Sequence, residues 1–187
     1  MKRNGLITII LLLIFSCSQN LMDKTIYFPD EDDSNLPAYT EWGYNSFGAK
    51  YERSYIFATH DIVPCKIIYR SGTLDFSLSG RTGRGYYSGY SGSEEITLNF
   101  SFPSVAMKEY KDLLALNKKE IDLKDASCTV KMTRNSQPEN LTILSGRLTF
   151  KRVQILRVDD KENRAILSGV FNLQFLRNDQ PETITDG

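Results

Sequence analysis

The chain has 187 residues, of which 41% are hydrophobic and 25% charged, a length and composition typical of a globular protein with one core. Lys and Arg together number 23, and Asp and Glu together also number 23. Without a basic excess there is no electrostatic case for nucleic acid or for an anionic surface, because both attract proteins with clustered Lys and Arg. We therefore expect one folded domain and no nucleic-acid partner.

Residues 1–16 have the pattern of a removable export signal. Lys2 and Arg3 give a positive start, and Gly5–Phe15 is an apolar run that is too short to span a bilayer. Removing this segment leaves 21 basic against 23 acidic side chains, a formal net charge of −2. An uncut anchor, or cleavage at another position, is the alternative.

The end of this segment, Leu13-Ile14-Phe15-Ser16-Cys17, resembles a lipobox, the cleavage motif of bacterial lipoproteins. The resemblance implies cleavage before Cys17 and lipidation of that residue by a diacylglycerol and an amide-linked acyl chain of the palmitate type. Two or more acyl chains anchor a protein durably, whereas a single chain binds a membrane reversibly. We therefore predict that the lipid on Cys17 attaches the protein to a membrane. Residues 17–37 would comprise this cysteine and a flexible tether, which includes the acidic run Asp30–Asp33.

Two further cysteines, Cys65 and Cys128, remain after Cys17. Disulfides form in the cell envelope, so these two thiols are candidates for a bridge. Both lie in stretches where apolar and polar residues alternate, and two small buried hydrophobic side chains fit that pattern equally well. The sequence leaves both alternatives open.

Residues 38–187 are predicted to form a single β domain. Over most of this range apolar and polar residues alternate with period two, which is typical of strands with one buried face. The alternation is clearest around Leu74–Leu78 and Ile96–Phe102, and we expect these two strands to pair. Further strands are predicted around Cys65–Tyr69 and Cys128–Met132, with a less regular first strand at Trp42–Phe47.

The last part of the chain predicts a long β-hairpin. Arg147–Val158 and Arg164–Leu176 carry apolar patterns on either side of the polar turn 159–163. Each strand would be roughly 40 Å long at about 3.3 Å per residue. The apolar phase changes near Lys151-Arg152, which indicates a β-bulge at that point.

One segment, Val105–Leu116, has a helical pattern, with Met107, Tyr110, Leu113 and Leu114 on one expected face. Together, about eight strands and one short helix predict a mainly β fold. The expected architecture is an antiparallel β-sandwich or a partly open barrel, and the sandwich is favoured.

The mature sequence resembles small lipoproteins of unknown function from Bacteroidetes. The resemblance implies a lipid-anchored location at the outer membrane and a β fold, and it implies no activity. Ser18 after Cys17 leaves open whether the domain faces the periplasm or the cell surface, and a chain ending at Gly187 would leave a sheet edge exposed. The resemblance rests on Phe15-Ser16-Cys17, Trp42-Gly43-Tyr44-Asn45, Gly146-Arg147-Leu148-Thr149-Phe150 and Leu167-Ser168-Gly169-Val170-Phe171.

The sequence contains few of the residue patterns that support catalysis. His60 is the only histidine, so any Ser-His-Asp or Cys-His arrangement must include it, and a solvated loop histidine is the favoured interpretation. No His-Glu-x-x-His or Cys-x-x-Cys motif is present to hold zinc. We expect no catalytic residue, cofactor or metal. An enzyme that uses paired carboxylates on a β scaffold is the second alternative.

A long Gly- and Tyr-rich loop, 80–93, separates the two best predicted strands. Tyrosines offer flat apolar faces with a hydroxyl at the rim, and arginines add planar donors, a mixture suited to sugars or protein surfaces. The preferred hypothesis is a non-enzymatic lipoprotein with a binding or assembly role for an unknown protein or glycan. The first alternative is a carbohydrate-binding module. The composition of the loop is also compatible with a hairpin tip that binds no ligand. The candidate ligand-binding residues are Arg81, Arg84, Tyr86, Tyr87, Tyr90 and Trp42.

Overall fold

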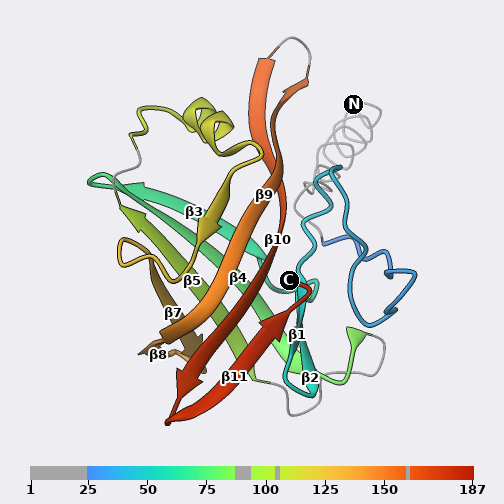
Figure 1. Cartoon of the computed structure of the whole chain (residues 1–187). Coiled ribbons are helices and arrows are strands. Elements are labelled where there is room, and N and C mark those ends of the chain that lie inside the picture. Colours follow the sequence, from blue (N-terminus) through green and yellow to red (C-terminus); the bar gives the residue numbers. More distant parts are fainter. Residues whose placement is uncertain (1–24, 87–93, 104–105, 159–160) are drawn as a thin grey trace, which may run out of the picture.

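The computed structural model describes residues 25–86, 94–103, 106–158 and 161–187 (Figure 1). The expected signal segment, Cys17, Tyr87 and Tyr90 lie outside the described residues. The side chains of residue 158 and of residues 161–164 are likewise not described.

The described residues form a mainly β fold with eleven strands in one antiparallel sheet, which confirms the predicted fold class. The sheet order is β6-β9-β10-β11-β1-β2-β4-β5-β7-β8, and β3 also pairs with β4. Among the described residues the one helical element in the order of the fold is a 3-10 helix, η3, at Tyr110–Leu116. The strands are β1 (Gly48–Tyr51), β2 (Ser54–Phe57), β3 (Cys65–Arg70), β4 (Thr73–Gly83), β5 (Glu95–Pro103), β6 (Glu120–Asp122), β7 (Thr129–Arg134), β8 (Gln137–Asn140), β9 (Thr142–Val158), β10 (Lys161–Arg177) and β11 (Gln180–Thr185).

The sheet folds over on itself at the short strands β1 and β2, so that its two halves face each other (Figure 1). One half contains β6, β9, β10 and β11, and the other contains β3, β4, β5, β7 and β8. Phe100 and Phe171 meet edge to face across the halves at 5.6 Å between ring centroids, as Phe76 and Phe150 do at 5.7 Å. The result is a sandwich-like core inside one continuous sheet, and the described strands do not close into a barrel.

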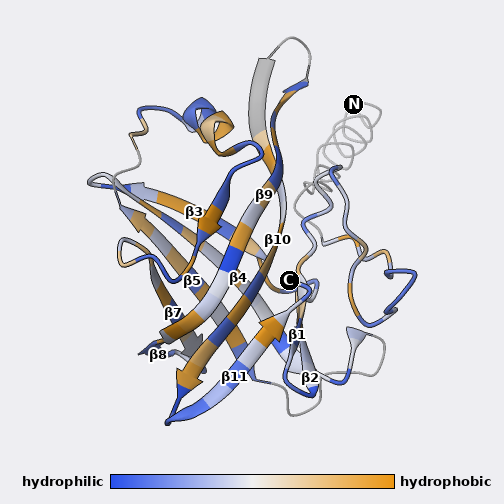
Figure 2. Cartoon of the chain, viewed as in Figure 1, coloured by the Kyte–Doolittle hydropathy of each residue, from blue (hydrophilic) through white to orange (hydrophobic). Residues whose placement is uncertain are grey.

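Period-two alternation places one face of each strand in this core. In β4 and β5 side chains are buried alternately, and the two strands pair as predicted from the sequence, with Phe76 opposite Phe100 in the register. Figure 2 shows hydrophobic and hydrophilic residues alternating along the strands. Each buried Phe or Leu contributes about 1.5–3 kcal/mol relative to its exposed state, so this alternation is the main source of stability.

The predicted hairpin is present as β9 and β10, each of which has 17 residues. Arg152 pairs with Ser168 and Phe150 pairs with Gly169, so Lys151 is the extra residue of a bulge at the predicted position. Both strands begin before the predicted start, at Thr142 and Lys161.

The helix differs from the sequence prediction in length and in type. A 3-10 helix has three residues per turn, so side chains three apart lie on the same face. Leu113 and Leu116 are accordingly buried, whereas Leu114 is 46% exposed. Tyr110 belongs to the same repeat as Leu113, but it is the first residue of the helix and is 40% exposed. The expected face of an α-helix, which required Tyr110 and Leu114, is therefore wrong.

The two ends of the described chain also differ from expectation. The last strand, β11, lies between β10 and β1, so it has a partner on both sides instead of an open edge. The predicted first strand at Trp42–Phe47 is irregular chain, and the first strand of the sheet is β1.

Residues 25–37, expected to belong to the tether, pack on the domain and form an irregular hairpin with residues 38–44. The amide of Ala38 donates to the carbonyl of Phe28 at 2.7 Å, and the amide of Ile26 donates to the carbonyl of Tyr44 at 2.9 Å. Gly48 permits this packing, because a Cβ there would lie 2.2 Å from Cδ of Pro37.

Candidate functional site

A loop of five residues, Tyr39–Gly43, leaves the N-terminal hairpin and lies over the outer face of β9 and β10. It begins directly after Ala38, which is hydrogen bonded to Phe28, and it ends directly before Tyr44. Gly43 has a φ of +75°, and a Cβ on it would lie 3.2 Å from Cδ1 of Ile166 on β10. The positive φ favours glycine at this position, and a side chain there would also push Ile166 aside.

The loop and β9 together form a pocket of about 360 Å³. This volume is near the lower end of the range of small-molecule sites, roughly 300–1,000 Å³. Its floor comes from β9, and its walls come from the loop. The lining residues are Tyr39, Thr40, Glu41, Trp42, Arg152 and Gln154.

A network of polar contacts centred on Glu41 fixes the loop to β9. Its carboxylate accepts a hydrogen bond from Nη1 of Arg152 at 2.6 Å and another from the Tyr39 hydroxyl at 3.2 Å. Its backbone carbonyl accepts a hydrogen bond from Nε2 of Gln154 at 3.0 Å. These contacts join residues 111 and 113 positions apart in the chain, so they hold the pocket in one geometry.

The charge states in the pocket follow from these contacts. The hydrogen bond from Arg152 lowers the pKa of Glu41, and the hydroxyl of Tyr39 acts in the same direction. Burial and then the hydrogen bond to Glu41 raise the pKa of Tyr39 to about 12. At neutral pH the pocket therefore holds an ion pair with no net charge and a neutral phenol.

Trp42 is the most exposed large hydrophobic side chain of the described residues, at 78%, and Tyr39 is 47% exposed. A large aromatic surface left in water is unfavourable for folding, so its presence in a pocket with fixed polar groups is typical of a recognition site. The pocket combines flat apolar surface with donors and acceptors at its rim.

Trp42 is the one predicted site residue that the structure places in this pocket. The sequence analysis missed Tyr39, Glu41, Arg152 and Gln154. The only signal near any of them was the predicted bulge at Lys151-Arg152, which carried no functional information. Their assembly depends on a contact between distant segments.

Tyr86, a predicted ligand-binding residue, packs against two other aromatic rings. Its ring stacks on that of Tyr27 with centroids 3.7 Å apart and 7° between the planes, and it meets Phe57 edge to face at 5.9 Å. One face of the Tyr86 ring is therefore covered by Tyr27. Arg84 nearby is exposed.

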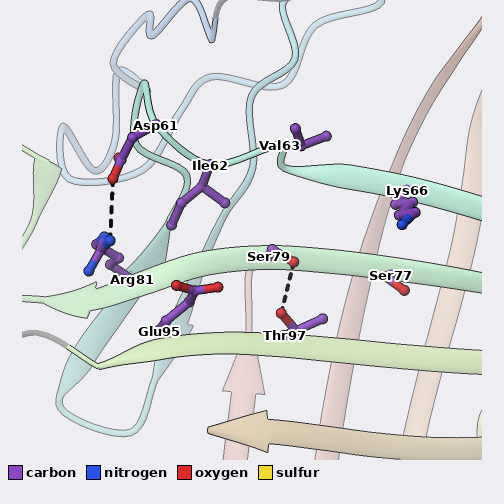
Figure 3. Close-up of a pocket in the computed structure, with 9 residues that line it drawn as sticks. All are labelled: Asp61, Ile62, Val63, Lys66, Ser77, Ser79, Arg81, Glu95 and Thr97. Atoms are coloured by element: carbon purple, nitrogen blue, oxygen red, sulfur yellow. Dashed lines mark hydrogen bonds and ion pairs between the residues drawn. The ribbon is translucent and has the colours of Figure 1, made fainter. Parts of the chain in front are cut away.

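Arg81 lines a second pocket, also of about 360 Å³, on the outer face of the other half of the sheet (Figure 3). This pocket lies beside the part of β4 between Leu78, where its pairing with β3 ends, and Arg81, where its pairing with β2 begins. Its walls come from the loop between β2 and β3, and its floor comes from β4 and β5. The lining residues are Asp61, Ile62, Val63, Lys66, Ser77, Ser79, Arg81, Glu95 and Thr97.

The polar groups of this second pocket are largely paired with each other. Arg81 lies 3.2 Å from the carboxylate of Asp61, and the hydroxyls of Ser79 and Thr97 are 2.9 Å apart (Figure 3). Hydrogen bonding from the Thr59 hydroxyl, and then the charge of Arg81, hold the pKa of Asp61 below its ordinary value. The lining contains two basic and two acidic side chains and no aromatic residue, so this pocket lacks the flat apolar surface that Trp42 gives to the first one.

The remaining candidate residues line neither of the two pockets. Cys65 is exposed on β3 and Cys128 is half-buried before β7, and both thiols are free, so the structure does not contain the disulfide. Burial, together with Asp125 and Asp122, raises the pKa of Cys128 to about 11. His60 is exposed on the loop between β2 and β3.

Comparison with known protein families, with curated proteins and with solved structures gives no match. In the part of the chain that the structure describes, no three His, Cys, Asp or Glu side chains lie together as metal ligands would. None of the helices in that part has the length and the apolar character needed to cross a membrane.

Proposed function

We propose that the protein is a lipid-anchored lipoprotein of the outer membrane, and that its β domain is a non-enzymatic module that binds carbohydrate in the Trp42 pocket. The export signal and Cys17 support the location. One observation carries the binding role: Trp42 is 78% exposed beside a polar network that is already fixed in place.

The chemistry of the pocket suits a sugar. A pyranose ring has an apolar face of C–H groups and a rim of hydroxyls, so it needs a flat apolar surface with in-plane donors and acceptors. The Trp42 indole supplies the surface. Arg152 and Gln154 supply donors, and Glu41 supplies acceptors, while their mutual contacts reduce the entropy lost on binding.

The same features favour an uncharged ligand and a binding role. The Glu41–Arg152 pair has no net charge, so the pocket attracts neither anions nor cations over long range. Glycoside hydrolysis normally uses two carboxylates on either side of the scissile bond, and the residues lining this pocket include one, Glu41. Binding without hydrolysis is therefore the better account of the site.

Trp42 is the only tryptophan in the chain, so the intrinsic fluorescence of the protein reports directly on the pocket. The test is a glycan array with the lipidated protein in a detergent that has no sugar headgroup, followed by fluorescence titration of each glycan retained. We expect saturable changes in Trp42 emission. By calorimetry, Trp42→Ala should bind at least roughly tenfold more weakly.

The matched control is Tyr69→Ala, which removes an exposed aromatic side chain on β3, away from the pocket. This variant should bind like the unmodified protein. Folded protein that retains no glycan, or equal binding by the Trp42→Ala variant, would contradict the proposal and leave an assembly role as the better hypothesis.

A further inference from the structure

The N-terminal segment exposes an unusual share of the apolar surface. Of the nine large hydrophobic side chains that are exposed in the described residues, four lie between residues 26 and 42. Two of these, Tyr39 and Trp42, belong to the pocket. The other two, Ile26 and Phe28, are 43% and 50% exposed and line no pocket described above.

Ile26 and Phe28 point away from the domain for a structural reason. In extended chain, alternate side chains lie on opposite sides. Tyr27 between them faces the domain, where its ring stacks on Tyr86 at 3.7 Å and its hydroxyl donates to the carbonyl of Ser34 at 2.8 Å. The Phe28 ring also lies 5.0 Å from that of Tyr44, between centroids, and the amide of Ile26 donates to the carbonyl of Tyr44, so the backbone of this segment is held in position.

The position of this pair in the chain limits what it can meet. Ile26 is nine positions after Cys17, a distance of at most about 30 Å for fully extended chain. A domain of this size is roughly 40 Å across. If Cys17 is held in a membrane, Ile26 and Phe28 therefore stay within about 30 Å of the lipid surface, which is less than the width of the domain, so contact with that surface is within their reach.

We propose that Ile26 and Phe28 insert into the headgroup region of the membrane that holds the anchor, and thereby set the orientation of the domain. The proposal rests on the lipid anchor at Cys17. Two partly exposed side chains bury too little apolar area to hold a protein on a membrane, but the anchor supplies a high local concentration of lipid. The anchor thus supplies the attachment, and the pair supplies the orientation.

The neighbouring charges make the contact selective. Glu31 and Asp32 are exposed and Asp30 is partly exposed, directly after the apolar pair. These carboxylates repel anionic headgroups within about 10 Å at ordinary ionic strength. The contact should therefore be closer on zwitterionic than on anionic lipid.

The single tryptophan again permits a direct test. In a Trp42→Phe background, Phe28→Trp places the only indole of the lipidated full-length protein at the proposed contact. The protein is reconstituted in phosphatidylethanolamine vesicles whose acyl chains carry bromine near the headgroup, which quenches indole at short range. We expect a loss of roughly half of the emission, as for a side chain about 5–10 Å into the boundary region.

The matched control is Val63→Trp in the same background, because Val63 is 73% exposed on the loop between β2 and β3. Its emission should be unchanged by the brominated lipid. In vesicles containing phosphatidylglycerol, the quenching of the indole introduced by Phe28→Trp should decrease.

The outcomes separate this proposal from the lipid anchor on which it rests. Protein that does not float with the vesicles overturns the anchor and the contact together. Protein that floats but shows equal emission in brominated and ordinary lipid overturns the contact alone. A blue shift without bromine quenching also overturns it, since the pair is then covered by protein, such as a second copy.

Discussion

The contact between Phe100 and Phe171 tests whether the two halves of the sheet form one core. Phe100 is fully buried on β5, and its ring meets Phe171 of β10 edge to face at 5.6 Å and lies 6.3 Å from Phe76. Phe100→Ala should lower the free energy of unfolding by about 3–5 kcal/mol, because it removes a buried ring and leaves a cavity between the halves. Of this, the edge-to-face contact with Phe171 accounts for about 0.5–1.5 kcal/mol.

The assay is urea unfolding followed by far-ultraviolet circular dichroism. With a slope of about 1–3 kcal/mol per molar urea, the midpoint should fall by roughly 2 M. A double-mutant cycle with Phe171→Ala should then give a coupling energy of at least about 0.5 kcal/mol. Val63→Ala, at a position that is 73% exposed, should change stability by less than about 0.5 kcal/mol. A loss below about 1 kcal/mol for Phe100→Ala, or additive effects in the cycle, would refute the face-to-face packing.

Three further predictions concern the candidate site and its surroundings. Arg152 lowers the pKa of Glu41, so the stabilisation from this pair is present above the ordinary pKa of 4.5 and is lost as the pH falls through the lower pKa of the folded state. Trp42 emission should report that transition, and Arg152→Gln should move it to higher pH. Tyr27→Ala and Tyr86→Ala should each accelerate proteolysis within residues 25–44, while the double variant should be no faster than either one, since the two rings support the same contact. Alkylation of unfolded, unreduced protein should label both Cys65 and Cys128, and a protected pair of thiols would show that a disulfide forms.

Several features of the fold could be predicted from the sequence because they depend on neighbouring residues. The alternation in β4 and β5 identified two strands and their pairing, and Phe76 does lie opposite Phe100. The change of apolar phase near Lys151 located a bulge, because one extra residue reverses the side to which every following side chain points. The position of the helix was predicted, but its type was not. Leu113 and Leu116 are three residues apart, and the apolar pattern did not distinguish a 3-10 helix from an α-helix.

The residues of the candidate site depend on contacts between distant segments. Trp42 was selected from its residue type alone, and the stacking of Tyr86 on Tyr27, 59 positions earlier in the chain, was not predicted. Glu41 and Arg152 are 111 positions apart, and their pairing requires the N-terminal loop to lie over the outer face of β9. No local pattern encodes that contact.

The sequence by itself determined that the chain forms antiparallel strands with one buried face, because alternation and turn residues act over a few positions. Only the tertiary structure decided that one sheet folds over to form both layers, that β11 is an inner strand, and that Trp42 lies beside Arg152. Those outcomes depend on how much apolar surface the whole chain buries. That amount is determined by contacts between distant segments and not by any local pattern.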